Sequence, residues 1–246
     1  MLPPYWLFGC IAFFMSSVLF LVEVYEKDLV NKWLSHYILV MILSLYLGAT
    51  SFSILSLVLD DIANKYGKNV WDIIISGKYG LVYYGGLVGV ITSTHFFIKK
   101  GLIEARIYNI LSFVIPFFHS ISRVGCYYAG CCYGVHSKIL IELPYFVNGF
   151  FSDSYRVPVQ LFEAVFELLT AIVLFVLFKK MTSPKNLLNF YLGTYAVFRF
   201  MIEFIRGDTV RGIILGLSFS QYVSILIVIS LIYQFVNKGR RNKCTP

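Results

Sequence analysis

The sequence predicts an all-α integral membrane protein with about seven transmembrane helices and one small cap outside the bilayer. Of its 246 residues, 58% are hydrophobic and only 14% are charged, and the mean hydropathy is +0.75. A soluble domain of this length does not keep so much apolar surface away from water. The apolar residues also fall into runs near the ~20 residues that a bilayer core requires. These observations exclude a soluble globular class.

Seven apolar runs are the expected spans, and we expect them to form one polytopic membrane domain over residues 1–246. In chain order the runs are Tyr5–Val24, Tyr37–Leu59, Tyr79–Ile98, Ile107–Ser120, Val159–Phe178, Leu187–Ile205 and Phe219–Val236. The fourth run is short unless it continues into the glycine-rich stretch after it. Gly48 in the second run indicates close helix packing or a kink. The segment from about 126 to 158 is expected to form an outer cap with short strands or an interfacial helix.

The distribution of Lys and Arg predicts the orientation in the membrane. The formal net charge is +8, but the cations lie in short loops between apolar runs. This pattern indicates topology and contact with anionic membrane lipids, with no nucleic-acid partner. The loops after the first, third and fifth spans and the tail hold twelve of the 21 cations, the opposite side holds eight, and Arg199 lies inside a span. We therefore expect the amino terminus outside and the carboxyl terminus in the cytoplasm.

A stretch rich in glycine and cysteine, residues 119–134, follows the fourth run. It reads HSISRVGCYYAGCCYG and places the fixed charge of Arg123 directly beside hydrocarbon. An arginine there needs an anionic partner or water, because its insertion at a helix centre costs roughly 2.5–3.5 kcal/mol. The glycines let the backbone turn sharply or approach a bound group closely. The stretch therefore predicts a phosphate-binding elbow at a membrane surface.

Two later spans add polar and ionisable residues at helical spacing. The fifth begins RVPVQLFE, so Gln160 and Glu163 share one face, and the sixth ends FRFMIEFIRGD, so Arg199, Glu203 and Arg206 share another. An internal ion pair that locks two helices is the structural alternative. The concentration of such residues in or beside spans favours a functional site. We expect a polar cavity in which an excess of guanidinium holds a lipid phosphate through planar, bidentate hydrogen bonds.

These motifs, in this order, resemble the prolipoprotein diacylglyceryl transferase family. The chain also has YYGGLVG at residues 83–89 and LGLSFSQ at 215–221, so the resemblance covers nearly its whole length. It implies a seven-span enzyme of the bacterial plasma (inner) membrane. Such an enzyme transfers diacylglycerol from phosphatidylglycerol to the lipobox cysteine thiol of a prolipoprotein, the first step of lipoprotein maturation. No metal, nucleotide or other cofactor is expected.

The resemblance assigns roles by motif position. The expected substrate-binding residues are Arg123, Gly134, Arg206, Gln160 and Glu163. The expected catalytic residues are Arg199, Glu203, Tyr84 and Tyr5. Arg123 takes the place of the family's phospholipid-binding arginine, and Arg199 takes the place of the arginine of the sixth span. Both suit the stabilisation of a departing phosphate, because charge develops on its oxygens as the carbon–oxygen bond breaks.

The chain departs from the family pattern at the proposed catalytic base. Tyr84 stands where most members have a histidine. A tyrosine with its ordinary pKa near 10 is a poor base at neutral pH. Glu203, Glu163 and His119 are the candidate substitutes. Alternatively, the acceptor differs from the family's acceptor.

Two further departures introduce cysteines. The asparagine and glutamate of the family signature are Cys126 and Cys131 in this chain, and Cys132 follows directly. This spacing fits no common zinc pattern, and the expected histidines are missing, so we expect no metal. A disulfide that joins Cys126 to Cys131 or Cys132 on an oxidising outer face is the secondary hypothesis.

Three classes of function therefore remain open. The first is the transferase or a relative that uses a different acceptor. The second is an accessory membrane protein that binds phospholipid without transferring it, and a second chain with the histidine intact in the same organism would favour it. The third is a transporter, because intramembrane charges also line substrate pathways. The sequence shows no inverted repeat and no matched pair of broken helices, which argues against a transporter.

Overall fold

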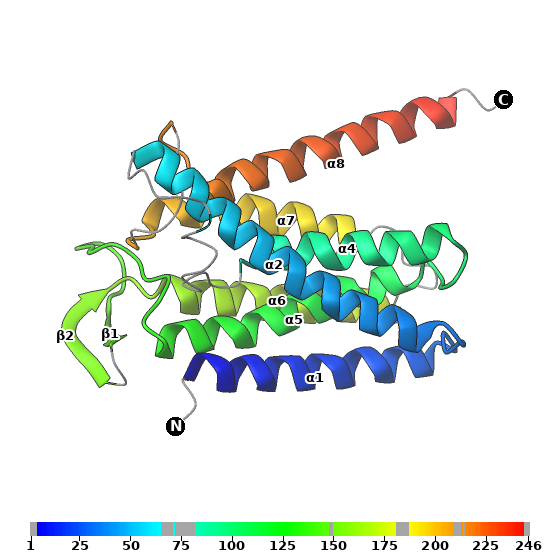
Figure 1. The fold of residues 1–246 in the computed structure, drawn as a ribbon, viewed down its shortest axis with the longest axis horizontal. Helices are drawn as coiled ribbons and strands as arrows, with labels where there is room; N and C mark the ends of the chain where they lie inside the picture. Colours follow the sequence, from blue (N-terminus) through cyan, green and yellow to red (C-terminus); the bar gives the residue numbers. More distant parts are fainter. Residues whose placement is uncertain are drawn as a thin grey trace. The chain divides into compact units, whose positions relative to one another are not determined.

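The computed structural model confirms the helical membrane architecture (Figure 1). It describes residues 4–64, 71, 82–147, 150–180, 187–208, 213 and 215–243. These residues form α1 Pro4–Glu26, α2 Leu34–Asn64, α4 Tyr83–Lys99, α5 Ile107–Tyr128, β1 Leu143–Val147, β2 Phe150–Arg156, α6 Val159–Lys180, α7 Leu187–Ile202, the 3-10 turn η1 Glu203–Ile205, and α8 Phe219–Lys243.

Five of these helices are long and apolar enough to cross a bilayer, namely α1, α2, α5, α6 and α8. The helices α4 and α7 occupy the expected third and sixth spans but have only 17 and 16 residues. The start of the expected third span, Tyr79, lies outside the described residues, as do several cations used for the orientation. The chain is a multi-pass membrane protein.

The fourth span is longer than the apolar run that predicted it. Helix α5 continues past Ser120 to Tyr128, through the first half of the expected elbow, and contains Pro116 in its interior. The chain turns only after the helix, where Gly130 has a φ of 68° and Cys132 a φ of 60°. The elbow is therefore a helix end followed by a tight turn, and Arg123 lies on the helix.

Two compact units divide the chain. One consists of Met1–Glu23, Asn109–Asp208 and Val223–Pro246, and the other of Val24–Tyr108 and Thr209–Tyr222. The expectation of a single membrane domain stays a prediction.

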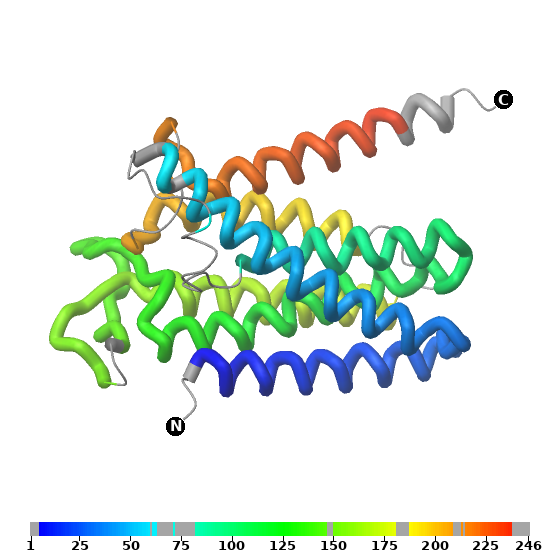
Figure 2. The backbone as a smooth tube through the Cα atoms, in the orientation of Figure 1, coloured from blue at the N-terminus to red at the C-terminus, as the bar shows by residue number. Residues whose placement is uncertain are grey.

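The first unit contains α1, α5, α6 and α7, whose backbones can be followed in Figure 2. Aromatic side chains pack between these helices. The ring of Phe113 on α5 lies 5.3 Å from that of Phe175 on α6, and Phe8 on α1 stacks on Tyr128 of α5 at 5.5 Å. These ring pairs add directional contacts to the apolar packing. At the far end of α1, Glu23 is buried and its Oε1 lies 2.8 Å from Nζ of Lys179.

The cap contains short strands, one of the two alternatives that the sequence left open, the other being an interfacial helix. Strands β1 and β2 pair in antiparallel register, with Leu143 opposite Arg156 and an irregularity after Pro144. The ring of Phe146 lies 5.6 Å from that of Tyr128, which fixes the hairpin to the end of α5. The cap therefore restrains the backbone that follows Arg123.

In the second unit, α2 and α4 approach closely at glycines. A Cβ on Gly85 would overlap the carbonyl oxygen of Gly48, and a Cβ on Gly89 would overlap that of Ser44. Small residues allow such backbone contact between membrane helices. The close packing expected at Gly48 is confirmed.

Replacement of Gly85 by alanine is expected to destabilise this helix pair. The added methyl group must displace the α2 backbone, and overpacking of this kind costs about 1–3 kcal/mol or more. The thermal unfolding midpoint in detergent should fall. Gly9→Ala is the matched control, because nothing lies within 4 Å of a Cβ at Gly9. An equal midpoint for both variants would contradict the close contact.

Candidate functional site

The site is built around Arg123, which is 7% exposed near the carboxyl end of α5. Its Nε donates a hydrogen bond to Nε2 of His119, one turn earlier, at 3.1 Å. The same nitrogen lies 2.8 Å from Oε2 of Glu163 on α6. The face that carries His119 and Arg123 therefore points into the protein, where the arginine has the anionic partner that its burial requires.

Glu163 links three helices. Its side chain is fully buried, and its Oε1 lies 2.7 Å from Nη1 of Arg199 on α7 while Oε2 contacts Arg123 on α5. Each of its two oxygens thus faces a different guanidinium. Because an unpaired charge at this depth costs several kcal/mol, Glu163 fixes the relative position of both arginines.

The network continues beyond α7 through Glu203. Arg199 Nη2 lies 2.8 Å from Glu203 Oε2, and Arg206 Nη1 lies 3.5 Å from the same oxygen. Arg206 also donates from Nε to Oδ1 of Asp208 at 2.8 Å and pairs with the other carboxylate oxygen through Nη2. The end of α7 and the turn after it are thereby held by a chain of alternating charges.

The expected excess of guanidinium is not found in this network. Three arginines are matched by three carboxylates, those of Glu163, Glu203 and Asp208. The internal ion pair that locks two helices, which the sequence offered as the structural alternative, is present between Glu163 on α6 and Arg199 on α7. The network therefore has no net positive charge that would attract a phosphate. Phosphate binding has to depend on the geometry of one guanidinium.

Arg123 has the required geometry. Its Nε contacts His119 and Glu163. Its outer edge is formed by Nη1 and Nη2, and among the described residues these two nitrogens contact only the sulfur of Cys126, which lies 4.0 Å from Nη1. A guanidinium presents five N–H donors in a planar fork. The outer edge of Arg123 therefore offers paired donors that match a phosphate group.

His119 is held as a neutral imidazole with a defined tautomer. Nε2 accepts from Arg123, so the ring proton lies on Nδ1 and is donated to Oε1 of Glu167 at 3.0 Å. His119 therefore cannot accept a proton from a substrate while Arg123 keeps this hydrogen bond. The pairing with Glu167 was not predicted, although Glu167 follows Glu163 by one turn on the same face.

The other candidate bases are also engaged. Both oxygens of Glu163 face arginines, and Glu203 is paired with Arg199 and Arg206 through Oε2. We therefore do not assign either of the carboxylates that the sequence suggested as the proton acceptor for the substrate thiol.

The structure brings Tyr5 to this site. Tyr5 lies in the first turn of α1 and interacts electrostatically with Arg123 and with Cys126, Cys131 and Cys132. Tyr84 is buried in the first turn of α4 and belongs to the other unit.

Gly134 and Gln160 support the loop after α5. Gln160 donates from Nε2 to the carbonyl oxygen of Cys131 at 2.6 Å. Gly134 donates its N–H to Val157 at 2.9 Å and forms a bridge with Arg206. A Cβ on Gly134 would lie 2.6 Å from the Val157 carbonyl oxygen, so the backbone contact explains the glycine. Because its N–H is used within the protein, that group does not hold a phosphate in this arrangement.

The cysteines of the loop form one cluster of free thiols. The Sγ atoms of Cys126, Cys131 and Cys132 all lie within 4.8 Å of one another, and the disulfide suggested by the sequence is not formed. Hydrogen bonds from the other two thiols, followed by the charges of Arg206 and Arg123, lower the pKa of the Cys132 thiol well below its usual value.

Comparison with known proteins agrees with the family resemblance of the sequence motifs. The family model for prolipoprotein diacylglyceryl transferase matches residues 3–237. A Clostridium tetani (strain Massachusetts / E88) protein named phosphatidylglycerol--prolipoprotein diacylglyceryl transferase is 32% identical over 161 residues, which cover 63% of this chain and 63% of that protein. A protein of the same name from Streptococcus pyogenes serotype M5 (strain Manfredo) is 34% identical over 187 residues, with 72% and 70% covered. Another, from Streptococcus uberis (strain ATCC BAA-854 / 0140J), is 33% identical over 186 residues, with 74% and 71% covered.

Proposed function

Because this chain belongs to the prolipoprotein diacylglyceryl transferase family, we propose that it transfers a diacylglyceryl group from phosphatidylglycerol to the lipobox cysteine thiol of a prolipoprotein. The chain spans 63% of the length of the clostridial relative and 70% of the Streptococcus pyogenes one. The observation that carries the proposal is the outer edge of the Arg123 guanidinium, which has no carboxylate partner among the described residues.

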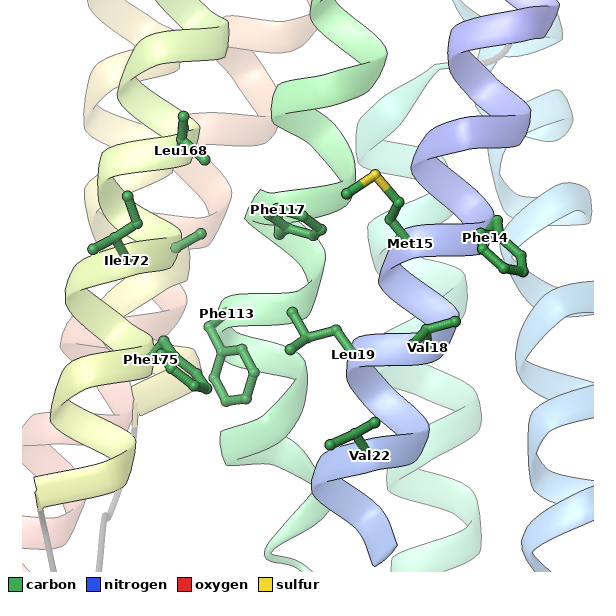
Figure 3. A pocket seen from close by; sticks show the side chains of 11 residues that line it. Phe14, Met15, Val18, Leu19, Val22, Phe113, Phe117, Leu168, Ile172 and Phe175 are labelled. Carbon is green, nitrogen blue, oxygen red and sulfur yellow. The ribbon is translucent and has the colours of Figure 1, made fainter. Parts of the chain in front are cut away.

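An apolar cavity in the first unit supports a lipid donor (Figure 3). It has a volume of about 480 Å³ and lies among α1, α5 and α6. Its lining consists of apolar side chains: Phe14, Met15, Val18, Leu19, Val22, Phe113, Phe117, Leu168, Ala171, Ile172 and Phe175. Phe117 precedes Arg123 by six residues on α5, which corresponds to about 9 Å along the helix axis. A phospholipid with its phosphate at Arg123 can therefore place an acyl chain against this cavity.

The reaction needs a thiolate and a stabilised leaving group. The acceptor sulfur attacks the glyceryl carbon, the carbon–oxygen bond breaks, and its electron pair passes to the phosphate oxygen. Donors from the outer edge of Arg123 stabilise the charge that develops there. Arg199, Glu203 and Arg206 act in this scheme by holding Glu163 and the turn after α7, so we assign them a positioning role. Tyr5 lies within electrostatic range of the same centre.

Direct transfer tests the proposal. Purified protein in detergent is incubated with phosphatidylglycerol and a lipobox peptide that carries one cysteine, and mass spectrometry measures the peptide. We expect the mass of a diacylglyceryl group on the thiol. A peptide with serine for cysteine, and phosphatidylcholine as the donor, are the controls and should give no product. Bound phosphatidylglycerol without any transfer would instead support the accessory lipid-binding function.

We also propose the orientation that the cation distribution predicts, with the amino terminus outside and the carboxyl terminus in the cytoplasm. A reporter protein that is active only in the cytoplasm should be active when it is fused after the last residue, and one that is active only outside the cytoplasm should be inactive there. The opposite result would reverse the assignment of all loops.

A further inference from the structure

The three-cysteine cluster is a built feature that the proposed transfer does not use. Cys126 belongs to the last turn of α5, whereas Cys131 and Cys132 lie in the loop after it. Their Sγ atoms nevertheless lie within 4.8 Å of one another.

The local backbone is folded to bring these sulfurs together. Gly130 and Cys132 both have left-handed φ angles, 68° and 60°. For a residue with a side chain, this conformation costs of order 1 kcal/mol or more and often marks a functional position. Hydrogen bonds hold the turn, from Cys131 N to Cys126 O at 3.2 Å and from Gln160 Nε2 to Cys131 O at 2.6 Å. The other end of the Gln160 amide, Oε1, is buried without a hydrogen-bond partner.

The surrounding charges suit a group of thiolates around a cation. Arg123 Nη1 lies 4.0 Å from Cys126 Sγ, and Arg206 interacts electrostatically with Cys132. Three thiolates and one divalent cation carry a net charge of −1, which the neighbouring guanidiniums stabilise. Without a cation, three thiolates at this separation would repel one another.

We propose that Cys126, Cys131 and Cys132 bind one thiophilic divalent cation of the zinc class. Zinc bound at about 2.3 Å from each sulfur in tetrahedral geometry separates the sulfurs by about 3.8 Å. The cluster therefore has to contract by about 1 Å at most. The sequence spacing argued against a metal because it matches no common zinc pattern, but the left-handed turn brings the adjacent cysteines back to Cys126.

Three sulfur ligands leave a fourth position open, and we assign it to the acceptor thiol. This assignment rests on the proposed transfer. Metal coordination deprotonates a thiol outright, and the proton passes to water. The coordinated sulfur then supplies the electron pair that forms the bond to the glyceryl carbon, and glycerol phosphate leaves from Arg123. No oxidant or reductant is consumed.

Metal content tests the site independently of transfer. The protein is purified without chelator, equilibrated with Zn²⁺ and desalted. Elemental mass spectrometry then measures the amount of zinc per chain. We expect about one zinc per chain in the wild type and less than about one tenth in Cys126→Ser and Cys132→Ser. Cys10→Ser is the matched control, because Cys10 is an exposed thiol on α1, and it should keep the metal. Substitution with Co²⁺ should give a thiolate-to-cobalt charge-transfer band that both cluster variants lose.

The outcomes separate this inference from the proposed function. Wild-type protein that transfers diacylglycerol but binds no zinc, or that shows the mass loss of a disulfide, would overturn the metal site and leave the transferase. Cluster variants that lose zinc yet transfer at the wild-type rate would overturn the role of the metal. Variants that lose both zinc and transfer, while still binding phosphatidylglycerol, would support it. Bound zinc without transfer to the lipobox peptide would overturn the assigned acceptor.

Discussion

Arg123→Ala is expected to lower the rate of diacylglyceryl transfer by about 10²–10³-fold or more, the loss typical for removal of one donor that stabilises a developing anion. Arg123 is the network arginine whose outer nitrogens face no carboxylate among the described residues. Its removal takes away the paired donors for the phosphate. Single-turnover transfer and binding of phosphatidylglycerol should both decline. Arg123→Lys keeps the charge without the planar fork and should recover only part of the rate.

Arg106→Ala is the matched control for Arg123→Ala. The Arg106 side chain is 58% exposed and pairs with Glu104, two residues earlier, and neither residue is a member of the buried network. Its replacement should leave transfer unchanged. Equal rates for both alanine variants would show that the outer edge of Arg123 does not bind the phosphate that leaves.

Hydropathy and helical spacing predicted most of the fold, and they failed where a polar helix continued. The helix starts expected at Ile107, Val159, Leu187 and Phe219 agree with the structure. The apolar run of the fourth span ends at Ser120, where the hydropathy falls, and the sequence left open whether the helix continues into the glycine-rich stretch. The backbone remains helical there because His119 and Arg123 make their hydrogen bonds inside the protein, which periodicity within one helix does not reveal.

The sequence predicted which residues belong to the site better than it predicted which of them contact one another. Spacing shows that Arg199 and Glu203 share a face, but it does not show that Glu163 on another helix lies between Arg199 and Arg123. Tertiary contacts of this kind depend on how helices pack. For the same reason, charge counting suggested free guanidinium where the structure has ion pairs. Cys132 was judged from spacing alone, whereas its left-handed backbone decides where its sulfur lies.

Glu163→Gln is expected to destabilise the protein strongly in lipid-free detergent. The substitution preserves the shape of the side chain but removes the charge that lies between Arg123 and Arg199. Removal of one partner from a buried ion pair costs about 3–5 kcal/mol, since the remaining charges stay buried without compensation. The thermal unfolding midpoint should fall clearly. Glu104→Gln is the control, because this glutamate lies in an exposed pair with Arg106, and its midpoint should not change.

Added lipid makes the same variant a test of where the phosphate binds. If a phosphate occupies the outer edge of Arg123, its negative charge replaces part of the charge that Glu163→Gln removes. A ligand that binds only the folded protein raises its stability by an amount that grows with affinity. Phosphatidylglycerol should therefore raise the unfolding midpoint of Glu163→Gln more than that of the wild type, and diacylglycerol, which lacks a phosphate, should raise both by similar amounts. An equal response of the variant and the wild type to both lipids would place the phosphate away from Arg123, because a distant anion cannot compensate the unpaired guanidinium.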